Sequence, residues 1–422
     1  MKRYEEYKDT GIAWLPRIPA HWEERKFKYC FVERSEKNHP DEEMLCATQS
    51  HGVIPQSMYQ NRVVVVNKGF EGLKLVKVGD FVISLRSFEG GIEYAYYQGI
   101  ISAAYTILTP VEKQCTEYFK RLFKSQPFIQ LLQTCVTGIR EGQNINYPLL
   151  GRKQIPIPPL VEQEKIVRFL ESKTLCIDAY VAERERELQL LDKLEESEIA
   201  NVITRGLNPD VKMKDSGIPW IGMIPEHWDI KRIASLFTGK VELNSDFAYK
   251  HAFKFNYGAL VPKEEVGDIE EYRSTYIKYS VLKKDDILIN GLNLNYDFVT
   301  QRVAIAPSDG IITSAYIVAR PRKGTNASYY TYLFKTMDNM KLFHGMGTGI
   351  RLTLSFDELK KQLIPVPSHE EQRAIVAYIE DKCNKVNSLI GELETEIEYL
   401  KEYKQKLIAD CVTGQINVQS EI

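Results

Sequence analysis

Apolar residues in two stretches of the chain recur at the spacing of an amphipathic helix, from about position 161 to 203 and from about 370 to 412. Steps of three, four and seven residues between them are typical of a coiled-coil seam. Because each stretch has one apolar stripe and is otherwise strongly charged, neither helix is expected to be stable alone. The sequence therefore predicts an antiparallel helix pair whose contacts are made by Ile177, Val181, Leu188, Leu191, Val386, Ile390, Leu393, Ile397 and Leu400.

Each long helix closes one copy of a longer pattern. The segment 9–22 returns 206 positions later as 215–228, and both copies have Gly-Ile-x-Trp near the start and His-Trp at the end. Paired His and Trp side chains suggest catalysis, but Gly, Pro and Trp at fixed spacing are more typical of a turn-rich segment held by aromatic anchors. We therefore expect a structural clamp in which each His is hydrogen-bonded.

Between the opening segment and the long helix, each copy repeats the same order of elements. Strand-like runs at 79–84 and 99–105 return at 285–290 and 310–316, and helical segments are expected at 116–132 and 328–343. A proline-rich run, Ile155–Pro159 or Ile364–Pro367, excludes helix and central strand and ends each globular region. The chain is thus predicted to be an α+β protein with a pseudo-two-fold internal repeat, divided into globular regions and long helices at 1–160, 161–206, 207–369 and 370–422.

The two copies diverge between the paired strands, where 85–98 is quite unlike 291–309. A shared scaffold with a different loop in each copy is what a duplicated binder needs to read two targets. A second loop, Thr-Gly-Ile-Arg, is instead the same in both copies and ends at Arg140 and Arg351. Glycine permits close backbone approach and arginine can fork onto phosphate or guanine, although a surface turn with a solvated arginine is an equally good interpretation.

Charge is distributed along the chain in the same two-copy order. Residues 1–160 and 211–369 each hold 21 Lys and Arg against 17 Asp and Glu, whereas 161–210 holds 7 against 12 and 370–422 holds 6 against 11. Mildly basic globular regions therefore alternate with acidic helices, which favours nucleic-acid contact by the globular parts. The excess is small, and many domains that bind no nucleic acid show it.

Other sequence features argue against catalysis, metal binding and a membrane location. We find no phosphate-loop motif, no glycine-rich cofactor turn after a strand and no amino-methyltransferase motif. The seven Cys are scattered, without a C-x-x-C pair, so reduced thiols and a cytoplasmic location are expected, with no metal site. The N-terminus has no apolar signal region, and no stretch is long and apolar enough for a membrane span.

With the repeat described, the whole chain resembles the specificity subunits of type I restriction-modification systems. The motifs that carry the resemblance are Ile-Pro-Ile-Pro-Pro-Leu-Val-Glu-Gln-Glu at 155–164, Ile-Pro-Val-Pro-Ser-His-Glu-Glu-Gln-Arg at 364–373, the helices that follow, and the paired openings. The resemblance implies a non-catalytic subunit in which each globular region is a target recognition domain for one half of a bipartite, asymmetric DNA site. It also implies that the helices set the gap and dock two methyltransferase subunits, which bind S-adenosylmethionine, and that restriction subunits using ATP and Mg complete the complex.

The family supplies no invariant base-reading residue, so candidates come from the residues themselves. Arginine suits guanine, asparagine suits adenine, and exposed tyrosines can stack or wedge, although for any one tyrosine buried packing is as good an interpretation. The candidate DNA-binding residues are Arg86, Tyr94, Tyr96, Tyr97, Arg140, Lys153, Asn293, Asn295, Tyr296, Arg302 and Arg351. Two alternatives stay open: a coiled-coil assembly scaffold that reads no DNA sequence, and a fused DNA-modifying enzyme.

Overall fold

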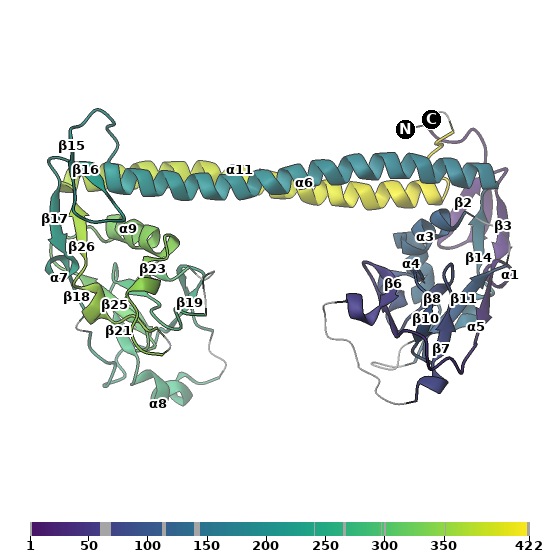
Figure 1. Cartoon of the computed structure of the whole chain (residues 1–422), viewed down its shortest axis with the longest axis horizontal. Coiled ribbons are helices and arrows are strands. Elements are labelled where there is room, and N and C mark those ends of the chain that lie inside the picture. The colour runs from purple at the N-terminus through teal and green to yellow at the C-terminus, as the bar shows by residue number, and fades with distance from the viewer. Residues whose placement is uncertain are drawn as a thin grey trace. The chain divides into compact units, whose positions relative to one another are not determined.

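The structure, a computed structural model, describes residues 2–59, 69–111, 115–138, 144–239, 241–264, 267–296, 298, 301–350 and 352–419. The chain forms two compact units: Met1–Glu185 with Glu394–Ile422, and Arg186–Leu393. Each unit combines one globular repeat with half of each long helix, α6 (Leu160–Arg205) and α11 (His369–Val412) (Figure 1). The predicted long helices are therefore confirmed, and the boundaries between units fall inside them.

Unit 1 is built around a four-stranded antiparallel sheet in the order β4-β11-β8-β9. Its strands are β1 (Tyr7–Ile12), β2 (Leu15–Pro19), β3 (Glu23–Lys26), β4 (Phe31–Arg34), β5 (Leu45–Thr48), β6 (Gly52–Pro55), β7 (Lys74–Val76), β8 (Phe81–Ile83), β9 (Glu93–Tyr94), β10 (Gly99–Ile101), β11 (Thr106–Pro110), β12 (Val136–Thr137), β13 (Asn144–Ile145) and β14 (Gln154–Ile157). Its helices are α1 (Phe27–Cys30), α2 (Ser87–Gly90), α3 (Thr116–Lys124), α4 (Gln126–Gln133) and α5 (Tyr147–Leu150), with short 3-10 turns at Gln56–Met58 and Phe70–Gly72.

Unit 2 repeats this arrangement, with the equivalent sheet in the order β18-β25-β22-β23. Its strands are β15 (Met213–Asp215), β16 (Met223–Pro225), β17 (Asp229–Arg232), β18 (Phe237–Thr238), β19 (Phe253–Asn256), β20 (Ala259–Pro262), β21 (Ser280–Leu282), β22 (Ile287–Ile289), β23 (Val303–Ile305), β24 (Gly310–Ile312), β25 (Ile317–Pro321) and β26 (Leu363–Val366). Its helices are α7 (Ile233–Leu236), α8 (Arg273–Tyr276), α9 (Ala327–Asn339) and α10 (Phe356–Leu359), with 3-10 turns at Ile269–Tyr272 and Leu342–Gly345.

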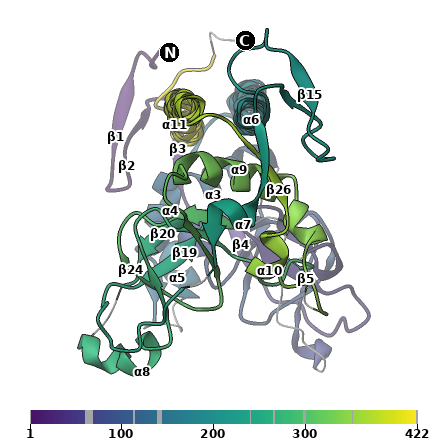
Figure 2. The same cartoon turned by 90° about the vertical axis from the view of Figure 1, so that its left-hand side faces the viewer.

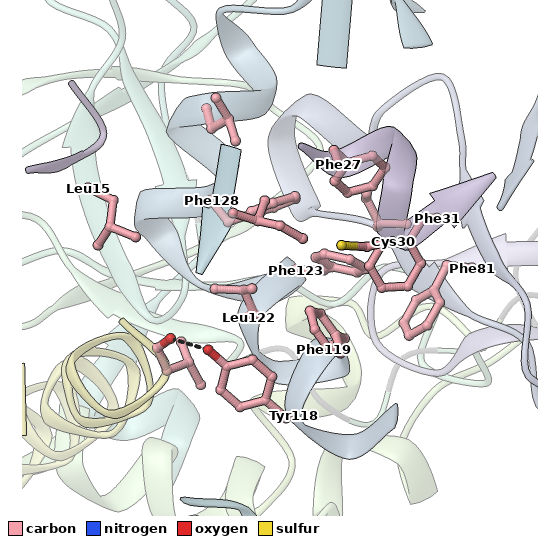
Figure 3. Close-up of a cluster of buried hydrophobic side chains, with 14 of the residues drawn as sticks. Leu15, Phe27, Cys30, Phe31, Phe81, Tyr118, Phe119, Leu122, Phe123 and Phe128 are labelled. Carbon is pink, nitrogen blue, oxygen red and sulfur yellow. Dashed lines mark hydrogen bonds between the residues drawn. The ribbon is translucent and has the colours of Figure 1, made fainter. Parts of the chain in front are cut away.

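In each unit the globular core continues into the helix pair. Phe27, Phe31 and Phe123 lie together in the core of unit 1 (Figure 3). Leu170 of α6 and Val412 of α11 belong to the same core. In unit 2, α6 and α11 lie side by side with α9 against them (Figure 2), and Ile203 and Ile379 join the core that α9 helps to form. The single apolar stripe of each helix is thus covered partly by the other helix and partly by the globular core.

The opening segments of the two repeats form the hairpins β1-β2 and β15-β16. Trp22 and Trp228 are fully buried, and each Trp carbonyl accepts a hydrogen bond from a hairpin lysine, Lys8 or Lys214. The adjacent histidine Nε2 lies 2.7 Å from the first-turn glutamate of the long helix in both units, His21 to Glu162 and His227 to Glu371. The expected clamp with a hydrogen-bonded histidine is confirmed.

Two local predictions needed refinement. The proline-rich runs form short strands, β14 and β26, but each pairs with one neighbour only, so the missing proline N–H groups do not interrupt a central strand. The helix expected over 116–132 is broken into α3 and α4, because Pro127 lies at the start of α4 and Ser125 between them is extended (φ −71°, ψ 143°). Its counterpart α9 has no proline and runs unbroken to Asn339, but it ends before the predicted limit of 343 because Lys341 is left-handed (φ 58°) and a 3-10 turn follows.

No helix within the described ranges is long and apolar enough to cross a membrane. All seven cysteines are free thiols, and no cluster of three or more His, Cys, Asp or Glu side chains in this part of the chain is placed to hold a metal ion.

Candidate nucleic-acid interface

In unit 2 the divergent loop that follows β22 packs against the loop that carries the repeated Thr-Gly-Ile-Arg motif. The backbone N–H of Leu354 donates to the carbonyl of Gly291 (2.9 Å), and that of Leu294 donates to Leu352 (3.2 Å). A Cβ at Gly291 would lie 2.5 Å from the Leu354 carbonyl oxygen, so this close approach requires glycine. The fold therefore joins the loop that differs between the two repeats and the loop that both repeats share into one surface.

That surface of unit 2 exposes apolar and amide side chains together. The exposed fractions are 97% for Ile350, 78% for Tyr296 and 56% for Phe298, whose ring stacks on His344 with 4.6 Å between centroids. The backbone of Asn293 is left-handed (φ 52°) and its side chain is exposed, while Asn295 donates to the Ile350 carbonyl at 3.3 Å. Exposed rings beside amides suit stacking and edge contacts to bases.

Arg302 does not lie on this surface. Only 1% of it is exposed, and its guanidinium donates to the carbonyls of Asn290 (3.0 Å) and Leu292 (2.8 Å). The backbone N–H of Arg302 donates to the Asp338 carboxylate at 2.6 Å. Arg302 is thus placed to hold the start of the divergent loop from inside the core, and this position argues against the direct DNA contact that the sequence suggested.

In unit 1 the corresponding loop forms one wall of a hollow of about 510 Å³. Tyr94, Tyr96 and Tyr97 line the hollow together, and Lys120 of α3 lies 4.4 Å and 4.5 Å from the ring centroids of Tyr94 and Tyr96. Gly52, at φ +74°, permits the approach, since a Cβ there would lie 2.6 Å from the Tyr94 carbonyl oxygen. The hollow therefore combines stacking surfaces with a positive charge.

An ion pair between Lys124 and the buried Glu93 lines the same hollow. Lys124 donates to the Glu93 carboxylate and to the carbonyls of Gly90 (2.9 Å) and Gln49 (3.2 Å). Burial raises the pKa of Glu93 to about 7, and the nearby charge of Lys124 only partly opposes this rise. The charge of this wall of the hollow consequently changes near neutral pH.

The remaining candidate residues have separate positions. Arg86 is exposed and precedes α2, which packs against β13 at the base of the repeated loop. Lys153 is half-buried beside β14, and its carbonyl accepts the Phe27 N–H at 2.8 Å. Arg140 and Arg351 lie outside the described residues, so the proposed roles of both arginines stay predictions.

Sequence reasoning missed the other walls of the unit 1 hollow. Gln49 and His51 come from the β5-β6 turn, and Lys120 and Lys124 come from α3, far apart in the sequence from the tyrosines. The two lysines lie one helical turn apart in α3, at an i, i+4 spacing that marks one helix face. The spacing of the two lysines indicates that they share one face of α3, but it does not indicate which loop packs against that face.

The residues expected to pair the long helices occupy one stripe on each helix. Val181, Leu393 and Ile397 are buried, and the other six, Ile177, Leu188, Leu191, Val386, Ile390 and Leu400, are half-buried. Polar contacts link the two helices in each unit, and those of unit 1 run in opposite chain directions. In unit 1 they are Asp178–Lys404 and Glu185–Lys401, and in unit 2 Tyr378 donates to Glu198.

Comparison with known proteins gives consistent results. The model of the type I restriction modification DNA specificity domain matches residues 225–399. The putative type I restriction enzyme MjaX specificity subunit of Methanocaldococcus jannaschii is 24% identical over 281 residues, which are 66% of this chain and 62% of the relative. The MjaVIII specificity subunit of the same organism is 23% identical over 371 residues, covering 82% of this chain and 81% of the relative.

A solved structure concerned with complex assembly and conformational transition of the type I restriction-modification system contains a chain of the same fold. The similarity has a TM-score of 0.65 at 16% identity and covers 94% of this chain and 99% of the other. At that identity the structural likeness establishes the fold alone.

Proposed function

We propose that this chain, a specificity subunit of the type I restriction-modification family, reads one half of a bipartite, asymmetric DNA site with each of its two units. One observation carries the proposal. The same scaffold occurs twice, and in both copies the loop that diverges follows the equivalent strand, β8 or β22, and reaches an exposed aromatic surface. A common frame with two different reading surfaces is what recognition of two different half-sites requires.

The surfaces in the two units favour different kinds of contact. In unit 1, Lys120 and Lys124 line a concave surface with Tyr96 and Tyr97, which suits phosphate contact next to stacking. In unit 2, Tyr296 and Ile350 are strongly exposed beside Asn293. Different chemistry on equivalent loops supports an asymmetric site.

In the same proposal the helix pair fixes the number of base pairs between the half-sites and docks two methyltransferase subunits. Catalysis belongs to those partners: the methyltransferase subunits bind S-adenosylmethionine, and restriction subunits use ATP and Mg. The strongly charged outer faces of α6 and α11, including Glu183 and Glu394, suit docking of a polar partner surface. The function of this chain is recognition and assembly.

The test is co-expression of the full chain with the methyltransferase encoded beside it, followed by mapping of methylated adenines in the host DNA. One motif with two specified halves and a fixed unspecified gap is the expected result. A control co-expression with Lys254→Val, a change of an exposed β19 residue, should give the same motif. A complex that forms but methylates no such motif would leave an assembly scaffold as the better description.

A further inference from the structure

Unit 2 contains a second hollow, of about 480 Å³, at the start of α11. Its walls come from β17, from Arg322–Thr325 after β25, and from the first turns of α9 and α11. Tyr330 lies in the first turn of α9, whereas the loop of the candidate DNA surface follows the other end of that helix. The hollow is therefore a separate feature from the DNA-reading surface described above.

The charge around this hollow is mainly positive. Lys231, Arg322 and Lys323 line it, against two nearby carboxylates: Asp229 lies 3.8 Å from Lys231, and Glu371 accepts a hydrogen bond from the lining hydroxyl of Ser368 at 2.9 Å. The N-terminal end of the 44-residue helix α11, which is the positive end of its dipole, borders the hollow at His369. An anion of small size suits both the volume and the charge.

Two residues that line the hollow each carry a buried polar atom without a hydrogen-bond partner among the described residues. The two atoms are the Tyr330 hydroxyl oxygen and the Gln372 Oε1, on side chains that are 1% and 2% exposed. The amide nitrogen of Gln372 donates to the Pro367 carbonyl at 2.8 Å, which fixes Oε1 as the free acceptor. A buried polar group without a partner costs about 1–3 kcal/mol, so its presence needs an explanation.

The first repeat shows that the fold does not require this arrangement. Phe119 stands where unit 2 has Tyr330, and Val111 stands where it has Arg322. Gln163, the counterpart of Gln372, makes the same bond to a proline carbonyl, but its Oε1 also accepts the N–H of Cys115 at 3.2 Å. The unpartnered groups and the added cation thus distinguish the second repeat.

We propose that this hollow binds a small phosphate-bearing ligand. Arg322, Lys323 and Lys231 neutralise the phosphate, and the Tyr330 hydroxyl donates a hydrogen bond to one of its oxygens. A protonated phosphate oxygen, or a hydroxyl of a phosphate ester, donates to Gln372 Oε1. The ligand must therefore offer a donor as well as negative charge. This site is independent of the proposed DNA reading.

Inorganic phosphate is the first probe, because it carries a P–OH donor near neutral pH, and sulfate, which has none there, is the matched anion. The unfolding temperature of the full chain is measured against each anion at constant ionic strength. Both ions stabilise proteins non-specifically, so specific binding is judged from the difference in unfolding temperature between phosphate and sulfate. We expect phosphate to give a saturable increase that sulfate does not reproduce.

The chain itself supplies the variants. Arg322→Val and Tyr330→Phe introduce the residues of the first repeat, so they are compatible with the fold. Loss of a charge-assisted hydrogen bond should weaken phosphate binding about tenfold in Arg322→Val. Tyr330→Phe should weaken it severalfold, and Lys254→Val, an exposed change on β19, should not alter it.

Three results would overturn the proposal. Equal effects of phosphate and sulfate would show that no donor is recognised. Phosphate binding that survives in both variants would place the anion elsewhere. Competition by a short DNA duplex, at matched ionic strength and with loss of binding to the same variants, would assign the cations to the DNA backbone instead of a small ligand.

Discussion

At the scale of single residues, two adjacent buried tyrosines in α9 differ in whether their hydroxyl groups make a hydrogen bond. The Tyr329 hydroxyl donates to the carbonyl of Ile203 in the last turn of α6 at 2.8 Å, and the equivalent Tyr118 donates to Val412 at the end of α11 at 2.7 Å (Figure 3). The carbonyls of a last helical turn have no partner within the helix, so each tyrosine satisfies one of them. The hydroxyl of Tyr330 satisfies none among the described residues.

The two tyrosines should therefore respond differently to the same substitution. Tyr329→Phe leaves a buried carbonyl without its donor and should lower the free energy of unfolding by about 1–2 kcal/mol. Tyr330→Phe removes a hydroxyl without a partner and should be neutral or slightly stabilising when no phosphate is present. Urea unfolding of the two variants, measured in phosphate-free buffer, checks the difference; equal losses would contradict it.

Glu93 gives a pH dependence whose sign follows from its burial. Because burial raises its pKa to about 7 in the folded state, from about 4.5 unfolded, the native protein binds more protons between these values. The contribution of Glu93 to stability should be fully present below about pH 4.5 and should be lost as pH rises through 7, at most roughly 3.5 kcal/mol at about 1.4 kcal/mol per pH unit. Glu93→Gln should flatten the unfolding free energy over this interval.

Glu162 provides a control, because its pKa is shifted in the opposite direction to that of Glu93. Burial alone would raise the pKa of Glu162, but hydrogen bonds from Tyr4 and His21 lower it overall. Its stabilising contribution is present above its unfolded pKa and disappears as pH falls through the lower, folded value. Glu162→Gln should therefore lower stability at neutral pH and remove the dependence on pH only in the acid limb, and a changed slope of stability against pH near 7 would contradict the assignment.

At the scale of elements, periodicity predicted the long helices well, because steps of three and four residues persist over many turns. Pro127 was a visible signal for the break between α3 and α4, but the strong apolar pattern on both sides obscured it. Pairing between distant strands left no such signal. Asp80 and its counterpart Asp286 are both buried beside an arginine, yet Arg34 comes from β4 and Arg320 comes from β25.

The helix pair should depend on its apolar stripe more than on its ion pairs. Ile397 is buried, so Ile397→Ala should lower the free energy of unfolding by about 2–4 kcal/mol through lost contacts and a cavity. Lys404→Met removes a surface ion pair to Asp178 (2.6 Å) and should cost less than about 1 kcal/mol. Thermal unfolding of both variants at low and high salt tests this order, and a larger loss from Lys404→Met would reverse it.

At the scale of the whole molecule, the sequence was sufficient for the duplication and the fold class, because motifs and offsets are properties of the sequence itself. The reading surfaces were predicted only in part. Tyr94, Tyr96 and Tyr97 do line one hollow, but its lysines come from a helix whose orientation no local pattern specifies. Arg302, chosen for its residue type, proved to be buried. Residue chemistry alone does not reveal burial.

The division into two compact units predicts that each half-site can be altered separately. Arg86→Ala and Tyr96→Ala change only the surface of unit 1, so the methylated motif should lose bases in one half and keep the other half and the gap. Tyr296→Ala should have the complementary effect through unit 2. Each arginine that contacts a phosphate should also lower the slope of log affinity against log salt by about 1. Adenine methylation mapping of the three co-expressed variants distinguishes the outcomes: a change in both halves from one substitution would mean that the two units do not read DNA independently.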